Sequence, residues 1–279
     1  MSSNTRAACV IGWPAKQSRS PKLHGYWIKR HKIEGDYRIE EITPEAFPAF
    51  VKNLTENGYV GANITMPHKD AALALSDPDD RARTIGAANT LWVDNGRLRS
   101  TNTDVTGFLG SLDVAAPGWD ERCQGAVVLG AGGAARAVVY GLIERGIKTV
   151  NVVNRTFEKA VMLRDRFGPN VQPAHWHDIP SLLDGGRLLI NATPLGMKGH
   201  PDHAIDLSRM ADDALVSDIV YVPLKTSLQA AAERRGLKTA NGLDMLLHQA
   251  VRGFQLWFGI KPEVTRELFD LLAADIVKT

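Results

Sequence analysis

The chain has 279 residues, of which 44% are hydrophobic and 23% charged, and its formal net charge at pH 7 is +2. This near-neutral balance argues against a nucleic-acid or other polyanionic partner, and no apolar stretch approaches the about 18 residues of a membrane span. The N-terminus lacks the apolar segment of a secretory signal, so we expect a cytoplasmic protein. The length fits two ordinary domains or one large one. Two cysteines, Cys9 and Cys123, allow no disulfide framework and are expected to be buried and reduced.

The first hundred residues alternate between strand and helix patterns and end in two short strands. Ala7–Gly12 is an apolar strand, and Tyr59–Thr65 is another that ends before Pro67. Ser20-Pro21 and Thr43-Pro44 each resemble a helix N-cap followed by proline in the first turn.

Beyond a helix that begins near residue 103, the alternation becomes regular. Strands are predicted at 126–129, 149–153, 187–191, 215–219 and 238–240. Such alternation indicates a parallel sheet with helices on both faces. Leu243–Phe258 and Pro262–Val277 are helical by periodicity and contain no strand, so they must pack on the rest of the protein.

A glycine-rich turn follows the strand at 126–129. The spacing Gly130-x-Gly132-x-x-Ala135 is the dinucleotide fingerprint in its Gly/Ala variant, in which phosphate oxygens meet N–H groups at a helix N-terminus. The next strand ends at Asn154-Arg155-Thr156, where an NAD site usually places an acidic residue. Arg155 would instead pair with a 2′-phosphate, so we expect NADP(H) as the cofactor. The alternative is a glycine turn that only packs the helix on the sheet.

Four polar clusters follow or precede strands in the first hundred residues. Each has a structural explanation: Ser20 could cap a helix, Lys69 could be a solvated surface residue, and Thr103 or Asp104 could cap the next helix. Lys69, however, lies at a predicted helix start, where the dipole favours anions. A parallel arrangement would gather all four clusters at one sheet edge, which favours a binding site. The clusters are Ser18–Ser20, Asn63–Lys69, Gly86–Leu91 and Ser100–Asp104.

With these motifs in place, the chain resembles the shikimate dehydrogenase family over nearly its whole length. The elements that carry the resemblance are GWP…SRSP…H at 12–24, NITMPHK at 63–69, GAANT at 86–90, NTD at 102–104, GAGGAAR at 130–136, NRT at 154–156, NATPLGM at 191–197 and GLDMLLHQA at 242–250. The resemblance implies an α/β fold with a Rossmann dinucleotide-binding domain at 103–242. It also implies a second α/β domain for the substrate at 1–102, completed by helices in 243–279. The helices that begin near Asp104 and Gly242 would act as hinges of a closing cleft.

The activity implied is the reversible, NADP-dependent reduction of 3-dehydroshikimate to shikimate in aromatic amino-acid biosynthesis. Lys69 and Asp104 would form the catalytic pair, with Lys69 as the proton donor; the alternative is that Asp104 only orients the hydroxyl and Lys69. Residues implied to bind or line the substrate are Ser18, Ser20, Asn63, Thr65, Asn89, Tyr221 and Gln249. Residues implied to bind NADP are Gly130, Gly132, Gly133, Ala134, Asn154, Arg155, Thr156, Lys159, Thr193, Met197 and Gly242.

Two alternative functions stay open. A quinate/shikimate or aminoshikimate dehydrogenase of the same superfamily is one, although Arg155 and Ser20 argue against the quinate enzyme. A non-catalytic NADP-binding sensor is another, although it would need neither Lys69 nor Asp104. His175, His177, His200 and His203 could suggest a metal, but their spacing fits no ligand set, and we expect none. A monomer and a homodimer are both compatible with the sequence.

Overall fold

The computed structural model describes residues 6–202 and 204–278. It divides into two compact units: unit 1 contains the chain up to Thr103 together with Gln249–Leu272, and unit 2 contains Asp104–His248 and the chain from Ala273 onward. Residues 1–5, which are expected to contain no secretory signal, and His203 lie outside the described residues.

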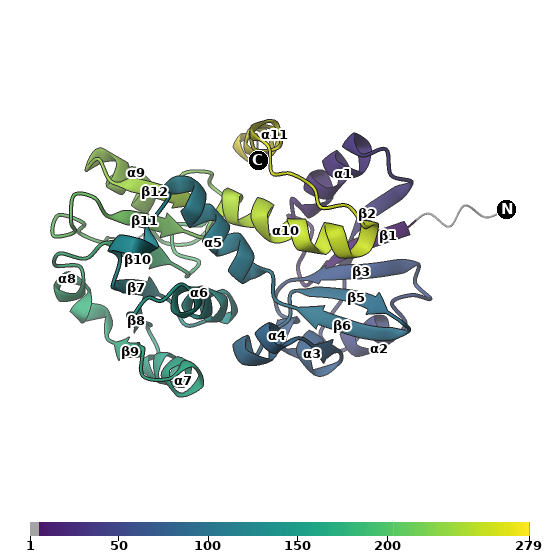
Figure 1. The fold of residues 1–279 in the computed structure, drawn as a ribbon, viewed down its shortest axis with the longest axis horizontal. Coiled ribbons are helices and arrows are strands. Elements are labelled where there is room, and N and C mark those ends of the chain that lie inside the picture. The colour runs from purple at the N-terminus through teal and green to yellow at the C-terminus, as the bar shows by residue number, and fades with distance from the viewer. Residues whose placement is uncertain (1–5, 203, 279) are drawn as a thin grey trace. The chain divides into compact units, whose positions relative to one another are not determined.

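Unit 1 contains a six-stranded mixed sheet with short helices (Figure 1). The strand order is β2-β1-β3-β5-β6-β4. The strands are β1 (Arg6–Gly12), β2 (Gly35–Glu41), β3 (Tyr59–Ile64), β4 (Asp77–Pro78), β5 (Thr90–Asp94) and β6 (Arg97–Thr101). The helices are α1 (Ser20–Arg30), α2 (Phe47–Lys52), α3 (Lys69–Ala74) and α4 (Asp80–Ile85).

The sheet of unit 1 brings the polar clusters to one edge, as expected, but it is a mixed sheet and not the parallel sheet from which this was predicted. β1, β2 and β3 are parallel, whereas β5 runs antiparallel to β3 and β6 antiparallel to β5. Asn63 near the end of β3 pairs with Thr90 at the start of β5, and Thr90 pairs with Thr101 at the end of β6. The hairpin therefore returns the chain to the same edge.

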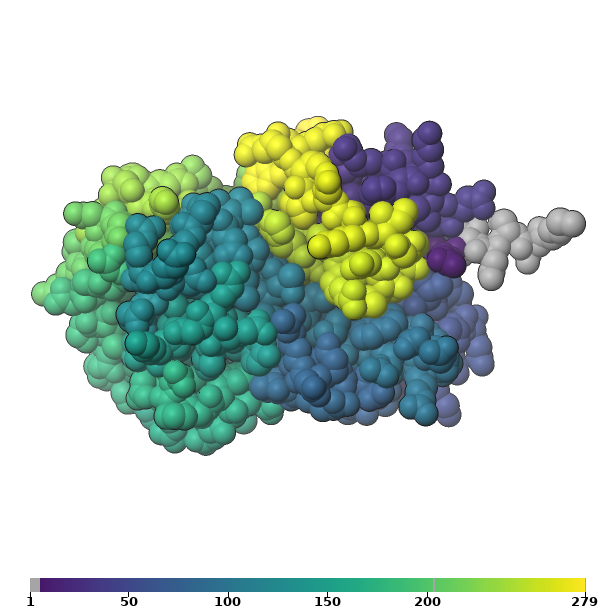
Figure 2. Space-filling model, in the orientation of Figure 1, coloured from purple at the N-terminus to yellow at the C-terminus, as the bar shows by residue number. Residues whose placement is uncertain are grey.

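The C-terminal segment of unit 1 covers an aromatic layer of its core. Trp27 of α1 and Phe254 of α10 (Gly242–Phe258) are both fully buried, with ring centroids 5.3 Å apart. The Trp27 indole N–H donates to the Glu263 carbonyl at 3.0 Å, which ties the segment before α11 (Arg266–Val277) to α1. Figure 2 shows this C-terminal segment in yellow against the purple α1.

Unit 2 is a fully parallel six-stranded sheet with helices beside it (Figure 1). Its order, β12-β11-β10-β7-β8-β9, is the doubly wound Rossmann order. The strands are β7 (Gly125–Leu129), β8 (Thr149–Val153), β9 (Val171–Ala174), β10 (Leu188–Asn191), β11 (Leu215–Asp218) and β12 (Lys238–Asn241). The helices are α5 (Asp104–Ala115), α6 (Gly133–Glu144), α7 (Phe157–Phe167), α8 (Ile179–Leu182) and α9 (Ser227–Arg234), with single 3-10 turns at Asp120–Arg122 and Trp176–Asp178.

The fold class is confirmed, and the five strands predicted between residues 126 and 241 are found within a residue or so of their expected bounds. β9 was not predicted, because Val171–Ala174 is a short edge strand containing Pro173, and proline weakens a strand pattern. Both cysteines are free and buried, as expected. None of the helices described is long and apolar enough to cross a membrane.

Three predicted helix starts are wrong. Ser20 does not cap α1: it is the first helical residue, and its amide donates to the Ser18 hydroxyl at 3.3 Å. Thr43-Pro44 forms a turn in which the Thr43 hydroxyl accepts from the Ala46 amide, so α2 begins only at Phe47. The last helix begins at Arg266 rather than Pro262, because the Thr265 hydroxyl accepts from the Leu268 amide, as an N-cap does.

Candidate functional site

The loop between β1 and α1 presents the two predicted serines of unit 1. Ser18 is half-buried, and Ser20 is 5% exposed at the first turn of α1. The loop is anchored to the end of β2, where the Glu41 carboxylate accepts a hydrogen bond from the Ala15 amide at 3.0 Å. That bond is the main cause of the lowered pKa of Glu41. Two serine hydroxyls at this sheet edge are suited to donate to a small carboxylate.

A cluster of neutral amides and hydroxyls lies beside this loop within unit 1. The Thr103 amide donates to Asn89 Oδ1 at 2.7 Å, and Asn89 Nδ2 donates to Thr103 Oγ1 at 3.0 Å and to Gln249 Oε1 at 3.4 Å. Asn63 Nδ2 donates to the Asn89 carbonyl at 3.4 Å and to Thr90 Oγ1 at 3.3 Å. Three predicted substrate residues, Asn63, Asn89 and Gln249, therefore share one hydrogen-bonded network at the end of the sheet. Thr65 follows β3 and is half-buried.

The two predicted catalytic residues each begin a helix. Lys69 is the first residue of α3 and is half-buried; its carbonyl accepts from the Ala88 amide at 3.0 Å, which joins it to the turn before Asn89. Asp104 is the first residue of α5 and is 7% exposed. Lys69 belongs to unit 1 and Asp104 to unit 2, and each is placed only within its own unit. Their catalytic pairing stays a prediction.

In unit 2 the glycine turn has the geometry that a dinucleotide requires. Gly130 adopts a φ of +106°, and a Cβ there would lie 2.9 Å from the Ala192 carbonyl oxygen. A Cβ at Gly132 would meet nothing within 4 Å, so the space above the turn is open. No side chain caps α6 at Gly132, which leaves its first amides available to a phosphate. Ala135 is fully buried and allows α6 to pack closely on the sheet.

The end of β8 is basic and accessible. Arg155 and Thr156 are exposed, and Thr156 is the N-cap residue of α7 without a side-chain cap. Asn154 Nδ2 donates to the Thr156 carbonyl at 2.8 Å, which shapes this turn. Lys159 is exposed in the first turn of α7. Arg155, Lys159 and the start of a helix together form a surface suited to a phosphate.

The remaining predicted residues of unit 2 lie in the first turn of α6 and after β10, β11 and β12. Thr193 Oγ1 donates to Asn191 Oδ1 at 2.7 Å, and Met197 follows in the same half-buried loop. Tyr221, predicted to line the substrate side, is half-buried after β11. Gly242 opens α10, and a Cβ there would lie 2.2 Å from the Ile219 carbonyl oxygen, so only glycine fits. Gly133 and Ala134 lie in the first turn of α6.

Four buried polar residues near the predicted site residues, two in each unit, were not assigned a role from the sequence. Asp218 ends β11 and Asn191 ends β10, and both are fully buried. In unit 1 the Tyr37 hydroxyl donates to Asn63 Oδ1 at 2.7 Å. His24 stacks on Tyr37 at 4.1 Å, and burial lowers its pKa to about 3, opposed by the nearby Asn63 side chain. Asn191 is the first residue of the NATPLGM motif at 191–197. For Asp218, the feature in the sequence that could have indicated a role is a charged residue at the end of an apolar strand.

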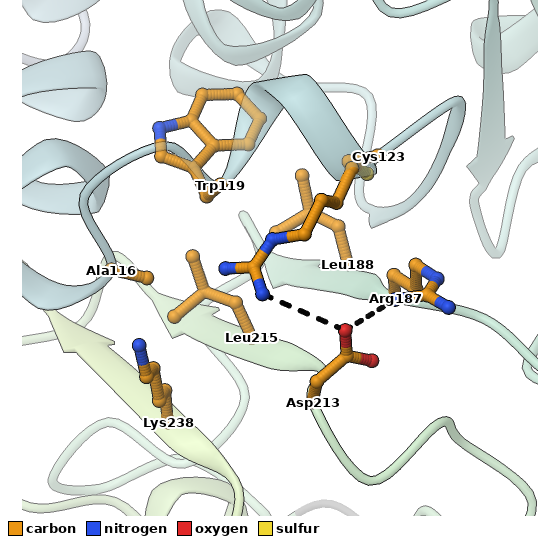
Figure 3. A pocket seen from close by; sticks show the side chains of 9 residues that line it. Ala116, Trp119, Cys123, Arg187, Leu188, Asp213, Leu215 and Lys238 are labelled. Atoms are coloured by element: carbon orange, nitrogen blue, oxygen red, sulfur yellow. Dashed lines mark hydrogen bonds and ion pairs between the residues drawn. The ribbon is translucent and has the colours of Figure 1, made fainter.

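A pocket lies at the other end of the unit 2 sheet from these loops (Figure 3). Leu188 and Leu215, the first residues of β10 and β11, line it, and Arg187 and Arg122 both pair with the Asp213 carboxylate. None of its lining residues was predicted to bind a ligand. Over residues 6–202 and 204–278, His, Cys, Asp and Glu side chains form no group of three or more that could hold a metal ion.

Comparison with known proteins shows which family the chain belongs to. Family models described as the shikimate dehydrogenase substrate binding domain, shikimate / quinate 5-dehydrogenase and the shikimate 5'-dehydrogenase C-terminal domain match residues 10–91, 118–212 and 242–266. A shikimate dehydrogenase (NADP(+)) of Rhodopseudomonas palustris strain TIE-1 is 60% identical over 276 residues, or 99% of each chain. The chain belongs to the shikimate dehydrogenase family.

Solved structures of family members have the same fold. The shikimate 5-dehydrogenase of Thermus thermophilus in complex with NADP(H) and shikimate superposes with a TM-score of 0.85 at 34% identity, covering 97% of this chain and 99% of that one. A quinate dehydrogenase from Corynebacterium glutamicum in complex with NAD reaches 0.87 at 29% identity, over 97% and 99%. The fold therefore does not separate shikimate from quinate enzymes within the family, and the distinction rests on individual residues.

Proposed function

We propose that this member of the shikimate dehydrogenase family catalyses the reversible reduction of 3-dehydroshikimate to shikimate with NADPH. The observation that carries the proposal is 60% identity, over 99% of the chain, to a relative named shikimate dehydrogenase (NADP(+)). The reaction belongs to the biosynthesis of aromatic amino acids. We also propose a cytoplasmic enzyme that is a monomer or a homodimer; light scattering coupled to size-exclusion chromatography distinguishes the two assemblies.

Unit 2 is proposed to bind the cofactor. The open space at Gly132 and the uncapped start of α6 fit a pyrophosphate, and Arg155 with Lys159 fits the 2′-phosphate of NADP. Thr193, Met197 and Gly242 are proposed to lie along the cofactor. When bound, NADPH supplies the hydride that reaches the carbonyl carbon of the substrate.

Unit 1 is proposed to bind the substrate. Ser18 and Ser20 donate hydrogen bonds to the carboxylate, and the neutral network of Asn63, Asn89 and Gln249 meets the ring hydroxyls. Reduction of a ketone leaves an oxygen that needs a proton, and a positioned acid must supply it. Lys69 is proposed to donate that proton as the ammonium and to accept it in the reverse direction. Asp104 is proposed to orient the hydroxyl or Lys69.

Initial rates with shikimate and with quinate, each with NADP and with NAD, test the proposal. We expect shikimate with NADP to give the highest kcat/KM of the four combinations, because Arg155 meets the 2′-phosphate and residues 154–156, directly after β8, include no acidic residue. A preference for quinate with NAD would assign the chain to the quinate enzymes instead. NADP binding without turnover of either acid would favour the non-catalytic sensor.

A further inference from the structure

We propose that Asp218, at the end of β11, is the positioning residue of the cofactor half-site, and that its carboxylate fixes the loops after β10 and β11 in the shape that NADP binds. The inference rests on the proposed function for the identity of the cofactor. It concerns hydrogen bonds within unit 2 alone.

The carboxylate of Asp218 is fully buried and is satisfied by three neutral donors. Its Oδ1 accepts from Asn191 Nδ2 at 2.9 Å and from the Val220 amide at 3.0 Å, and its Oδ2 accepts from Thr226 Oγ1 at 2.7 Å. Burial raises the pKa of Asp218, and these three hydrogen bonds oppose that rise. Burying a carboxylate is costly unless donors satisfy it, and here every one of these donors belongs to a strand end or loop around the half-site.

The first set of contacts runs from Asp218 to the loop after β10. Asn191 Nδ2 also donates to the Leu195 carbonyl at 3.1 Å, while Asn191 Oδ1 accepts from both the amide and the hydroxyl of Thr193, at 3.0 and 2.7 Å. The Thr193 hydroxyl accepts in turn from the Leu195 amide at 3.1 Å. This loop touches the dinucleotide turn, since a Cβ at Gly130 would lie 3.0 Å from Thr193 Cγ2. Asp218 orients the Asn191 amide and, through it, Thr193.

The second set of contacts fixes the chain between β11 and α9. The Val220 N–H, held by Asp218, belongs to the same peptide group as the Ile219 carbonyl, whose oxygen would lie 2.2 Å from a Cβ at Gly242. Thr226, the other donor, caps α9 by accepting from the Gln229 amide at 3.3 Å. Tyr221 lies between these two anchored points. One carboxylate thus connects the segments that carry Thr193, Tyr221 and Gly242.

The residue type follows from the number of donors. An asparagine at position 218 has one acceptor oxygen, which can keep both Asn191 and Val220 if its amide group faces Thr226. The Thr226 hydroxyl can then accept that amide and donate to Gln229 Oε1, already 3.4 Å away. Asp218→Asn should therefore retain most of the positioning, whereas Asp218→Ala leaves the donors of two loops unpaired.

The experiment measures NADPH and shikimate dissociation constants of the full chain by fluorescence titration and calorimetry. For Asp218→Ala we expect NADPH to bind on the order of tenfold more weakly, with Asp218→Asn close to wild type. Shikimate affinity should change less than NADPH affinity, because most of the residues proposed to bind shikimate belong to unit 1 and only Tyr221 lies on a segment that Asp218 holds. Ser111→Ala is the control, since it removes a buried hydrogen bond of α5 in the same unit, from Ser111 Oγ to the Phe108 carbonyl at 2.7 Å. It should lower stability without weakening NADPH binding.

Hydrogen exchange gives a readout that does not depend on turnover. The amides of Thr193, Leu195 and Val220 should exchange faster in Asp218→Ala than in wild type or Ser111→Ala. If Asp218→Ala does not fold, Asn191→Ala removes the first set of contacts and should weaken NADPH binding and speed exchange at Thr193 and Leu195. Unchanged NADPH binding and exchange in whichever of these variants folds would overturn the inference. A wild-type protein that turns over no shikimate with NADP would overturn the proposed function instead. The hydrogen-exchange result would still test whether Asp218 fixes the loops of unit 2, because it does not depend on turnover.

Discussion

The two units solve the same problem differently: each must hold polar loops at the end of a sheet. Unit 1 uses a network of neutral groups, in which Asn63, Asn89 and Gln249 exchange hydrogen bonds with threonines. Unit 2 uses one buried carboxylate, Asp218, that accepts three donors. A neutral amide can exchange its partners for ligand hydroxyls at little electrostatic cost, whereas a satisfied buried carboxylate cannot.

This difference separates two kinds of residue. In unit 1 the network itself is proposed to contact the substrate, so its loss should change both stability and substrate affinity. In unit 2 the network lies behind the ligand residues, and the exposed Arg155 is proposed to contact the cofactor. Variants of residues that touch ligand should change kinetics with little loss of stability, and variants of the buried groups should change stability as well.

Lys69→Ala should have the largest effect. Removal of a general acid typically lowers kcat by about 10²- to 10⁴-fold, while the KM for shikimate should change far less and the melting temperature should stay near that of wild type. Steady-state kinetics with thermal denaturation measure this. Lys52→Ala, an exposed lysine of α2 in the same unit, is the control and should retain wild-type kcat. Turnover at the wild-type rate in Lys69→Ala would contradict the catalytic role.

Arg155→Ala should alter cofactor choice in unit 2. Loss of a charge-assisted contact to the 2′-phosphate should raise the KM for NADP by about 10- to 100-fold, with the KM for NAD unchanged, since NAD lacks that phosphate. Arg164→Ala, at an exposed arginine of α7, the helix that follows Arg155, should leave both values unchanged. Equal loss of affinity for NADP and NAD would place the adenosine end away from Arg155.

The sequence was sufficient for the parts of each unit that depend on local patterns. The apolar strands, the turn at Gly130 and Gly132, and the basic end of β8 are written in consecutive residues, so each could be predicted. The pairing of Thr90 with Asn63 and with Thr101 depends on an antiparallel hairpin, whereas the sequence pattern predicted a parallel sheet. The bonds of Asp218 to Asn191 and of Tyr37 to Asn63 join different strands, and no spacing in the sequence indicates them.

His24→Phe should reduce the loss of stability that unit 1 undergoes as the pH decreases, because it replaces a histidine that is buried in its neutral form. Its folded-state pKa is lowered from 6.5 to about 3, so between those values the unfolded chain takes up a proton that the folded chain does not. His24 therefore does not affect stability above pH 6.5. As the pH decreases below 6.5, the free energy of unfolding decreases by about 1.4 kcal/mol per pH unit, which amounts to about 2 kcal/mol at pH 5.

Urea unfolding at a series of pH values from 7 to 5 measures this effect. His24→Phe keeps an aromatic ring against Tyr37 and Phe254 and should show a shallower loss of stability than wild type. His177→Phe, at an exposed histidine whose side chain is 81% accessible, should keep the wild-type slope. Identical slopes for wild type and His24→Phe would mean that the buried ring is not the group that titrates.

Tyr37→Phe should have the smallest effect and tests the neutral network most directly. It removes the hydroxyl that donates to Asn63 Oδ1 at 2.7 Å and leaves a buried acceptor unsatisfied, which should lower the free energy of unfolding by about 1 kcal/mol. Because Asn63 loses the bond that fixes its amide orientation, the KM for shikimate should rise severalfold while that for NADP stays constant. Tyr26→Phe removes an exposed hydroxyl bonded to Glu267 in the same unit and should change neither quantity. A Tyr37→Phe protein that loses stability but keeps its shikimate KM would show that Tyr37 supports the fold of unit 1 and does not orient Asn63 toward the substrate.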